Sequence, residues 1–172
     1  MAAAASETKS KDFAMSRVFD APRELMWQCF TDPERMKHWW GPKGFKVIAS
    51  KMDLRVSGTY HYGMTAPNGS AMWGLFTYRE IVPQQKLVFV NSFSDEKGGV
   101  TRHPGSPTWP LYMLSTFTFE DAPDGKTKFT VRWQTLNATA EEQKTFDTMR
   151  DSMTQGWGGT MEQLAAYLAS AK

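Results

Sequence analysis

The side chains best suited to acid–base chemistry are three histidines, which lie far apart at His38, His61 and His103. None has the short spacing of a metal-binding pair such as H-x-x-x-H, so we expect no metal site. His61 lies between Tyr60 and Tyr62. It is the best general acid or base if it faces a cavity, because an unperturbed imidazole has a pKa of about 6.5. His103 and Tyr60 are further candidates for this role, and the alternative is that His61 faces solvent.

Cys29 is the single cysteine, so we expect no intrachain disulfide and a cytoplasmic location. It lies in an apolar helical stretch without an evident histidine partner, which favours a small buried residue over a reactive thiol. The sequence contains no G-x-S-x-G, P-loop or G-x-G-x-x-G motif. Gly156-Trp-Gly-Gly159 follows no expected strand, which argues against phosphate binding. We predict no cofactor, and whether the chain is an enzyme stays open.

Aromatic and methionine side chains are numerous, with seven Trp, eleven Phe, five Tyr and eleven Met. They either fill a core or line a cavity for flat apolar ligands. Core packing is the simpler interpretation for any one of them, so the ligand-site hypothesis depends on the set. Strand parity cannot be assigned, because one β-bulge exchanges the two faces. The expected ligand-binding residues are Trp39, Trp40, Tyr60, Tyr62, Trp73, Phe76, Phe93, Trp109, Met113, Phe117, Trp133, Met153 and Trp157.

Three of these tryptophans have two interpretations each. Trp39 and Trp40 precede a Gly-Pro break, where they could anchor the core or form the mouth of a pocket. Trp109 lies in a long stretch rich in Gly and Pro, residues 94–110. Long loops of this kind are often functional, so Trp109 could close over a ligand, or it could simply pin the loop.

Composition and charge exclude several classes of protein. The net charge is +2 and no basic run of five residues occurs, so we expect no nucleic-acid partner. Residues 1–11 lack the apolar segment of a signal peptide and are expected to form a disordered tail. No stretch approaches the roughly 18 apolar residues of a membrane span, so we expect a soluble protein. The length fits a single domain over residues 12–172.

Strand and helix patterns follow one another in a simple order. A first strand is expected over 12–19, a helix from Asp20-Ala-Pro22 to about residue 30, and a short helix that begins at Asp32-Pro33 and ends near Trp40. Six strands follow. Because their connections are mostly short, they should pair as an antiparallel meander. Their ranges are 45–54, 59–64, 71–81, 86–93, 111–119 and 126–136.

The last segment predicts one long helix. Thr139 and Glu142 have the spacing of a capping box, which starts a helix. An apolar stripe then recurs every three or four residues from Phe146 to Leu168 and stays in phase across three glycines. We therefore expect one unbroken helix, straight or bent, from 139 to about 169, with its apolar side across the hollow of the sheet. A coiled-coil seam is the alternative.

Four stretches resemble a known family: FDAPRELMWQCFTDPERMKHWWGPKGF at 19–45, MDLRVSGTYHY at 52–62, YREIVPQQKLVFV at 78–90, and QGWGGTMEQLAAYL at 155–168. They are similar to the SRPBCC superfamily, in the branch named after the C-terminal domain of the activator of the heat-shock-protein-90 ATPase. The resemblance implies an α+β helix-grip fold, in which about seven antiparallel strands curve around a long C-terminal helix and enclose an apolar cavity. Many relatives have a Gly pair where this chain has Ser57-Gly58.

Three functions are compatible with this sequence. The first is binding of a small hydrophobic or aromatic ligand in the cavity, without membrane insertion, by a monomer or homodimer. The second is a cyclase- or hydrolase-type enzyme that uses His61, His103 or Tyr60 to move protons. The third is an interaction module that contacts a chaperone, which only the name of the resembled family suggests.

Overall fold

The curved sheet forms from alternating apolar and polar strands joined mostly by short turns. The computed structural model describes residues 12–171, and the predicted disordered tail lies outside them. The strand order is β1-β8-β7-β5-β4-β3-β2, and the short β6 pairs with β5. All pairs are antiparallel. The strands are β1 (Phe13–Phe19), β2 (Lys46–Met52), β3 (Thr59–Thr65), β4 (Ala71–Val82), β5 (Lys86–Ser94), β6 (Val100–Thr101), β7 (Met113–Ala122) and β8 (Lys126–Thr135), with a 3-10 turn at Pro123–Gly125 before β8.

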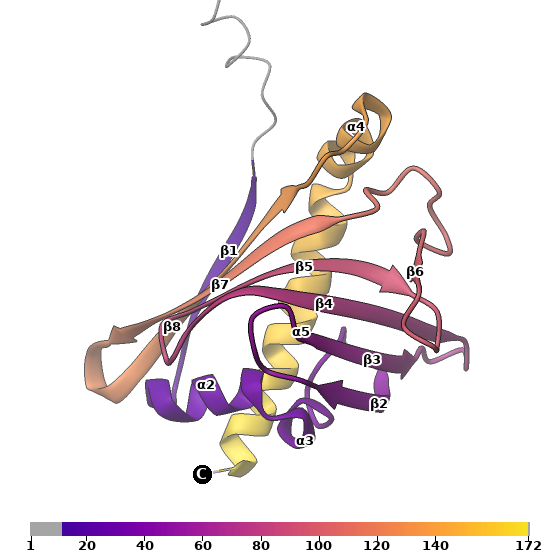
Figure 1. Ribbon diagram of the computed structural model, residues 1–172. Helices are drawn as coiled ribbons and strands as arrows, with labels where there is room; N and C mark the ends of the chain where they lie inside the picture. The colour runs from indigo at the N-terminus through magenta and orange to yellow at the C-terminus, as the bar shows by residue number, and fades with distance from the viewer. Residues whose placement is uncertain (1–11, 172) are drawn as a thin grey trace, which may run out of the picture.

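Two short helices close one end of the sheet's hollow (Figure 1). Helix α2 spans Arg23–Thr31 and α3 spans Pro33–Met36, as the two proline signals predict. The Asp32 side chain caps α3 by accepting a hydrogen bond from the amide of Glu34 at 2.9 Å. The aromatic residue at the end of α2, Phe30, is buried among the rings of the sheet.

The turn that has one glycine fewer than in many relatives is well formed. Ser57 adopts a positive φ of 70° itself. Gly58 is required for space, because a Cβ there would lie 2.2 Å from the carbonyl oxygen of Asp53. Backbone hydrogen bonds from Ser57 N to Tyr78 O and from Tyr78 N to Gly58 O, at 2.8 and 2.9 Å, fasten the turn to β4.

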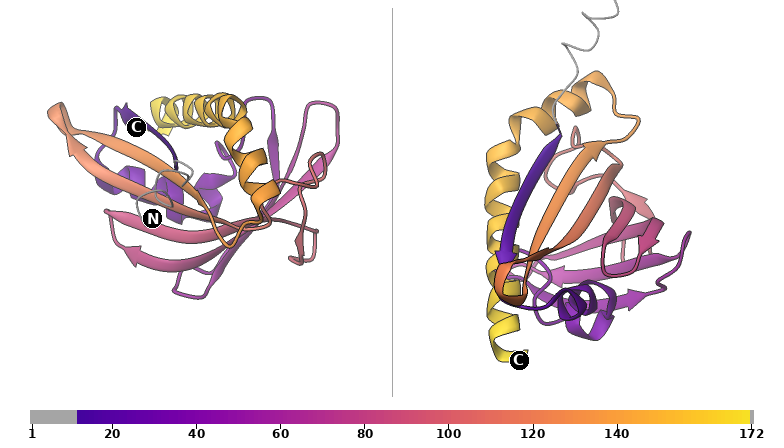
Figure 2. Two further views of the ribbon diagram at one scale, coloured as in Figure 1. Left: turned by 90° about the horizontal axis from the view of Figure 1, so that it is seen from above. Right: turned by 90° about the vertical axis from the view of Figure 1, so that its left-hand side faces the viewer.

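The C-terminal segment forms two helices, so the prediction of an unbroken helix is wrong in this respect. Helix α4 spans Ala140–Thr148, α5 spans Arg150–Ala171, and the chain changes direction at Met149 (Figure 2). The capping box of Thr139 and Glu142 is confirmed. The three glycines that interrupt the apolar stripe, Gly156, Gly158 and Gly159, are all helical and lie inside α5. Within it, Gly159 permits a close approach, since a Cβ there would lie 3.2 Å from the amide nitrogen of Lys43.

Helix α5 lies across the hollow of the sheet, as the apolar stripe predicts (Figure 2). Met153, Trp157, Met161, Leu164 and Leu168 are all buried on it. Within residues 12–171, no helix is both long enough and apolar enough to span a membrane. The hollow is therefore enclosed by the sheet on one side and by this helix on the other, and the question is how fully side chains fill it.

Candidate functional site

A cavity of about 380 Å³ lies between the sheet and α5. This volume falls within the range of about 300–1,000 Å³ that is usual for small-molecule sites. The cavity extends toward the loop between β5 and β7, residues 95–112, here called the cover loop. Its lining is Trp40, Gly41, Pro42, Phe45, Tyr62, Met64, Met72, Phe76, Phe89, Asn91, Ser92, Phe93, His103, Gly105, Ser106, Trp109, Pro110, Met113, Ser115, Phe117, Trp133, Met149, Ser152, Met153, Gly156, Trp157 and Thr160.

The sheet wall of the cavity is set by strand parity, because every second side chain points to the same face. On β5 this places Phe89, Asn91 and Phe93 on the concave side. A cross-strand pair adds to the wall: Tyr62 on β3 lies opposite Gly74 on β4. A Cβ at residue 74 would meet the Tyr62 hydroxyl at 2.3 Å, so the glycine makes room for the ring that borders the cavity.

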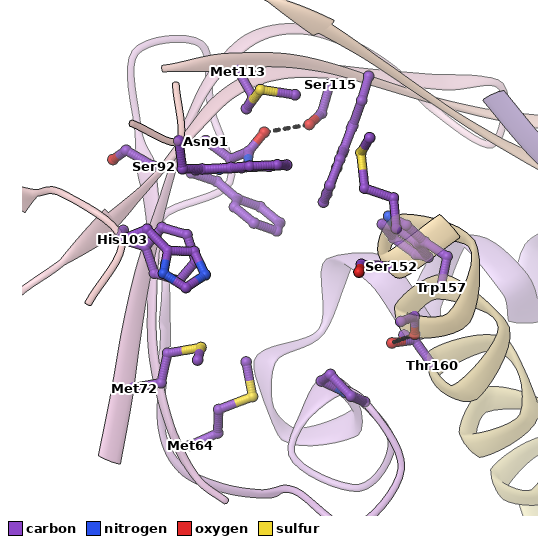
Figure 3. Close-up of a pocket in the computed structure, with 18 of the residues that line it drawn as sticks. Met64, Met72, Asn91, Ser92, His103, Met113, Ser115, Ser152, Trp157 and Thr160 are labelled. Carbon is purple, nitrogen blue, oxygen red and sulfur yellow. Dashed lines mark hydrogen bonds between the residues drawn. The ribbon is translucent and has the colours of Figure 1, made fainter. Parts of the chain in front are cut away.

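The helix wall comes from one face of α5 and the residue before it. Its members are spaced by three, one, three, one and three residues after Met149, which places them along one side of a helix. Trp157 is the central member, with ring centroids 5.7 Å from Trp40 and 5.6 Å from Phe117. Gly156 leaves open space, because a Cβ at this position would have no atom within 4 Å. Figure 3 shows Trp157 and Thr160 facing the strands across the cavity.

The cover loop is fastened to α4 at three points. Arg102 forms an ion pair with the carboxylate of Glu142. The hydroxyls of Thr108 and Thr145 are hydrogen-bonded at 2.7 Å, and Trp109 packs on the ring of Phe146 with centroids 6.0 Å apart. The Arg102 guanidinium lowers the pKa of Glu142, and the amide of Thr139 contributes to this. Trp109 pins the loop and also lines the cavity, and its closure over a ligand stays a prediction.

Polar groups are few in this wall and their hydrogen bonds are specific. The Ser115 hydroxyl donates to Oδ1 of Asn91. The amide of Gly105 donates to Nδ1 of His103 at 2.9 Å, and burial lowers the pKa of this imidazole. Burial raises the pKa of Tyr62 to about 12, an effect that the nearby Trp40 indole partly offsets. No Asp, Glu, Lys or Arg is among the lining residues.

Ten of the predicted ligand-binding residues line the cavity and three lie elsewhere. The ten are Trp40, Tyr62, Phe76, Phe93, Trp109, Met113, Phe117, Trp133, Met153 and Trp157. Trp39 is a core anchor whose indole donates to the carbonyl of Cys29 at 3.1 Å. Tyr60 is fully buried beside the cavity and its hydroxyl lies 3.0 Å from that of Ser50. Trp73 lies over Gly63, on the opposite face of the sheet from Tyr62.

The three acid–base candidates are not brought together. His61 stacks on Trp73 at 5.2 Å, and its Nε2 lies 3.1 Å from the carbonyl oxygen of Asp95, away from the cavity wall. Burial raises the pKa of Tyr60 far above its ordinary value. Only His103 of the three lines the cavity. In the part of the chain that the structure describes, no three His, Cys, Asp or Glu side chains are arranged to hold a metal ion.

Sequence reasoning missed the polar part of the wall, which includes Asn91, Ser92, Ser115 and Thr160. A signal for Asn91 exists in LVFVNSF, where it follows Leu87 and Phe89 at the inward parity and interrupts an apolar series. That signal becomes readable only once the parity of β5 is known. Met64, Met72 and Gly156 were missed for the same reason, since each depends on which side of its element faces inward.

Several solved structures are similar to this chain over most of its length. A protein from Mycobacterium smegmatis is 25% identical, with a TM-score of 0.73, over 91% of this chain and 90% of its own. A protein from Arthrobacter aurescens is also 25% identical, with a TM-score of 0.76, over 92% and 86%. The AHSA1 protein of Silicibacter pomeroyi, 22% identical with a TM-score of 0.70 over 94% and 100%, shares the fold. No curated protein matches.

The family profile described as Activator of Hsp90 ATPase homolog 1-like protein matches residues 20–169. This range contains nearly all of the curved sheet, both short helices, the cover loop, and α4 with α5. The expected helix-grip architecture is thus confirmed by the fold and by its solved neighbours. By sequence and by structure, the chain belongs to the Activator of Hsp90 ATPase homolog 1-like family, a branch of the SRPBCC superfamily.

Proposed function

We propose that this protein binds a small apolar or aromatic molecule in the cavity between the sheet and α5. The observation that carries the proposal is a hollow of about 380 Å³ whose wall is mostly aromatic and methionine side chains. An apolar space of this size is the usual form of a small-molecule site, and burial of ligand surface would supply the binding free energy.

The composition of the cavity wall favours flat, aromatic ligands that differ in size and outline. Trp40, Trp133 and Trp157 are neighbours whose ring pairs are steeply inclined, at 68° and 74°. Edges and faces of aromatic rings are thereby both available for contact with another ring. Five methionines complete the wall: Met64, Met72, Met113, Met149 and Met153. Their flexible thioethers adapt to different outlines, which suits a site that accepts a class of compounds.

Catalysis has less support than binding. His103 is the one predicted acid–base residue in the wall, and its Nδ1 is engaged by the amide of Gly105. In the neutral ring the proton is then on Nε2, which makes this atom a donor and not a base. A contact with a chaperone rests on the family description alone. Binding is therefore the function that the geometry supports best.

The test is a fluorescence titration with N-phenyl-naphthylamine, whose emission rises in apolar surroundings. We expect saturable binding of one probe molecule per chain. Gly156→Leu should fill the open space at this position and weaken binding at least tenfold. Gly158→Ala is the matched control, because it makes the same gain in helix propensity, about 1 kcal/mol, at a glycine outside the cavity wall. Equal binding by both variants, or no saturable binding to the unmodified protein, would overturn the proposal.

A further inference from the structure

We propose that the ligand is an uncharged molecule bearing an oxygen acceptor, such as an aromatic ketone, which accepts hydrogen bonds from donors fixed in the cavity wall. This inference rests on the proposed function and names the chemistry of its ligand. The carrying observation is that the amide of Asn91 and the imidazole of His103 have their acceptor atoms engaged inside the protein, so that their N–H donors are left for the cavity.

Asn91 is the first such group. A primary amide offers one acceptor oxygen and two N–H donors. The hydroxyl of Ser115 occupies Oδ1, and Ser115 itself is fully buried. Within residues 12–171 the Nδ2 group has no hydrogen-bond partner, while Asn91 is part of the cavity wall. The amide therefore presents N–H groups to whatever fills the space, as Figure 3 shows for its position beside Ser115 and Met113.

His103 behaves in the same way. The amide of Gly105 donates to Nδ1, which fixes the neutral tautomer with its proton on Nε2. The ring packs on Phe93 with centroids 4.6 Å apart, so its orientation is held from the side as well. Because burial disfavours the charged ring, the imidazole offers a single neutral N–H donor.

Trp40 also borders the cavity, but its indole N–H does not face the open space. Its side chain is only 8% exposed, and its Nε1 is buried. The Tyr62 hydroxyl is the polar group near this indole, and a hydrogen bond from the indole lowers the pKa of Tyr62 against the effect of burial. The adjacent Trp39 donates to a backbone carbonyl, as buried indoles usually do. Because protein atoms cover Trp40 Nε1, Asn91 and His103 are the two fixed donors on which the inference rests.

The other polar side chains of the cavity wall are hydroxyls, and none of the lining residues is ionised. Thr160 donates to the carbonyl of Gly156 at 2.9 Å and Ser115 donates to Asn91, so the protons of these two wall hydroxyls are engaged inside the protein. Ser92, Ser106 and Ser152 carry hydroxyls that can turn either way. With no ionised side chain in the wall, a buried anion would lack a counter-charge. An uncharged acceptor fits the two fixed neutral donors, Asn91 and His103, better than a carboxylate does.

The experiment compares three molecules of one skeleton: fluorene, fluorenone and fluorene carboxylate. Each competes with bound N-phenyl-naphthylamine. We expect fluorenone to bind about fivefold to tenfold more tightly than fluorene, the effect of one good hydrogen bond, and the carboxylate to bind most weakly. The carbonyl stretching band of bound fluorenone should also move to lower frequency than in hexane, which reports the hydrogen bond independently of affinity.

Two variants locate the donors. Asn91→Asp keeps an acceptor for Ser115 and removes the amide N–H groups. His103→Asp keeps an oxygen for the amide of Gly105, as in an Asx turn, and carries no N–H donor. At least one variant should abolish the preference for fluorenone while fluorene affinity stays within twofold. Equal binding of fluorene and fluorenone, tightest binding of the carboxylate, or an unchanged preference in both variants would overturn the inference alone. Failure of all three compounds and of the fluorescent probe would overturn the proposed function as well.

Discussion

The space between the sheet and α5 is packed solid at the end near α2 and hollow at the end near the cover loop. At the packed end, Phe30 enters from α2 and contacts the rings of Trp39, Phe117, Phe119 and Phe129, with centroids 4.7–5.2 Å apart. At the hollow end α5 lines the space, no residue of α2 or α3 is part of the wall, and the cover loop packs against α4. The same residue types therefore build a core or a cavity, depending on which element reaches inward.

Trp39 and Trp40 show the same difference within one dipeptide. Both are buried and their rings lie 5.5 Å apart, nearly perpendicular. The Trp39 indole faces the packed end and is hydrogen-bonded to Cys29. The Trp40 indole borders the cavity. Within one dipeptide, therefore, one indole belongs to the packed core and the other to the wall of the cavity.

The largest effect is expected from truncating one ring at each end. Phe30→Ala should lower the free energy of unfolding by about 3–5 kcal/mol, because it opens a void in a dense ring cluster. Phe93→Ala, at a partly exposed position of the cavity wall, should cost less than half as much. Urea denaturation of the two variants measures both values. Equal losses would mean that the two ends are packed alike.

A smaller effect is expected at the cover loop. Glu142→Gln keeps the capping box, since Gln serves at the same helix position, but removes the charge that holds Arg102. Bound N-phenyl-naphthylamine should dissociate several times faster in stopped-flow measurements. The free energy of unfolding should change by less than about 1 kcal/mol because Arg102 is half exposed. The matched control is Glu80→Gln, which breaks the surface pair with Lys86 and should leave the dissociation rate unchanged.

A pH effect follows from His103, whose pKa is lowered by burial. Above the ordinary value of about 6.5, the ring is neutral in the folded and unfolded states, and its ionisation contributes nothing. As the pH falls below that value, the unfolded state binds the proton more readily than the folded state does, so the free energy of unfolding declines. Protonation of the ring in the folded state would also break the hydrogen bond that the Gly105 amide donates to Nδ1. Probe affinity should fall as the pH drops from 6.5 toward 5, above the range in which the Glu142 carboxylate titrates.

His103→Asn is the control for this titration. Its affinity should be flat over the same interval, because the remaining wall groups do not ionise there. An identical pH dependence in the variant would assign the effect to another group and contradict the role of His103.

The smallest effect is expected at Cys29, on the packed side. Burial raises the pKa of this thiol to about 11, so almost no thiolate is present near neutral pH. A disulfide reagent such as dithionitrobenzoate should leave the folded protein unlabelled for hours and react at once in guanidinium chloride. Rapid labelling of the folded protein would show that the packed end opens as readily as the hollow end.

The fold was largely predictable because its signals are local. Proline and Asp32 mark the helix starts, Thr139 and Glu142 form the capping box, and Gly or Pro breaks separate most of the strands. The bend at Met149 was not predictable in this way. An apolar stripe stays in phase through a small change of direction, and what redirects α4 is its contact with the cover loop, a tertiary effect.

The site was predictable as a set of aromatic residues and less so as individuals. Trp73 and Tyr62 lie in similar alternating stretches, yet they point to opposite faces of the sheet. The assignment depends on parity, which pairing with Gly63 and Gly74 reveals and the sequence alone does not. The hydrogen-bond donors of the cavity are harder still to predict from sequence, because the role of Asn91 depends on a hydrogen bond from Ser115 on a neighbouring strand.

The most direct test uses the seven tryptophan indole N–H signals of an isotope-labelled sample, assigned by single Trp→Phe variants. Trp40, Trp109, Trp133 and Trp157 line the cavity, and Trp27, Trp39 and Trp73 do not. On titration with fluorenone, we predict that the four cavity signals shift while the other three stay in place. Shifts spread equally over all seven, or confined to Trp27, Trp39 and Trp73, would contradict a ligand site at the hollow end.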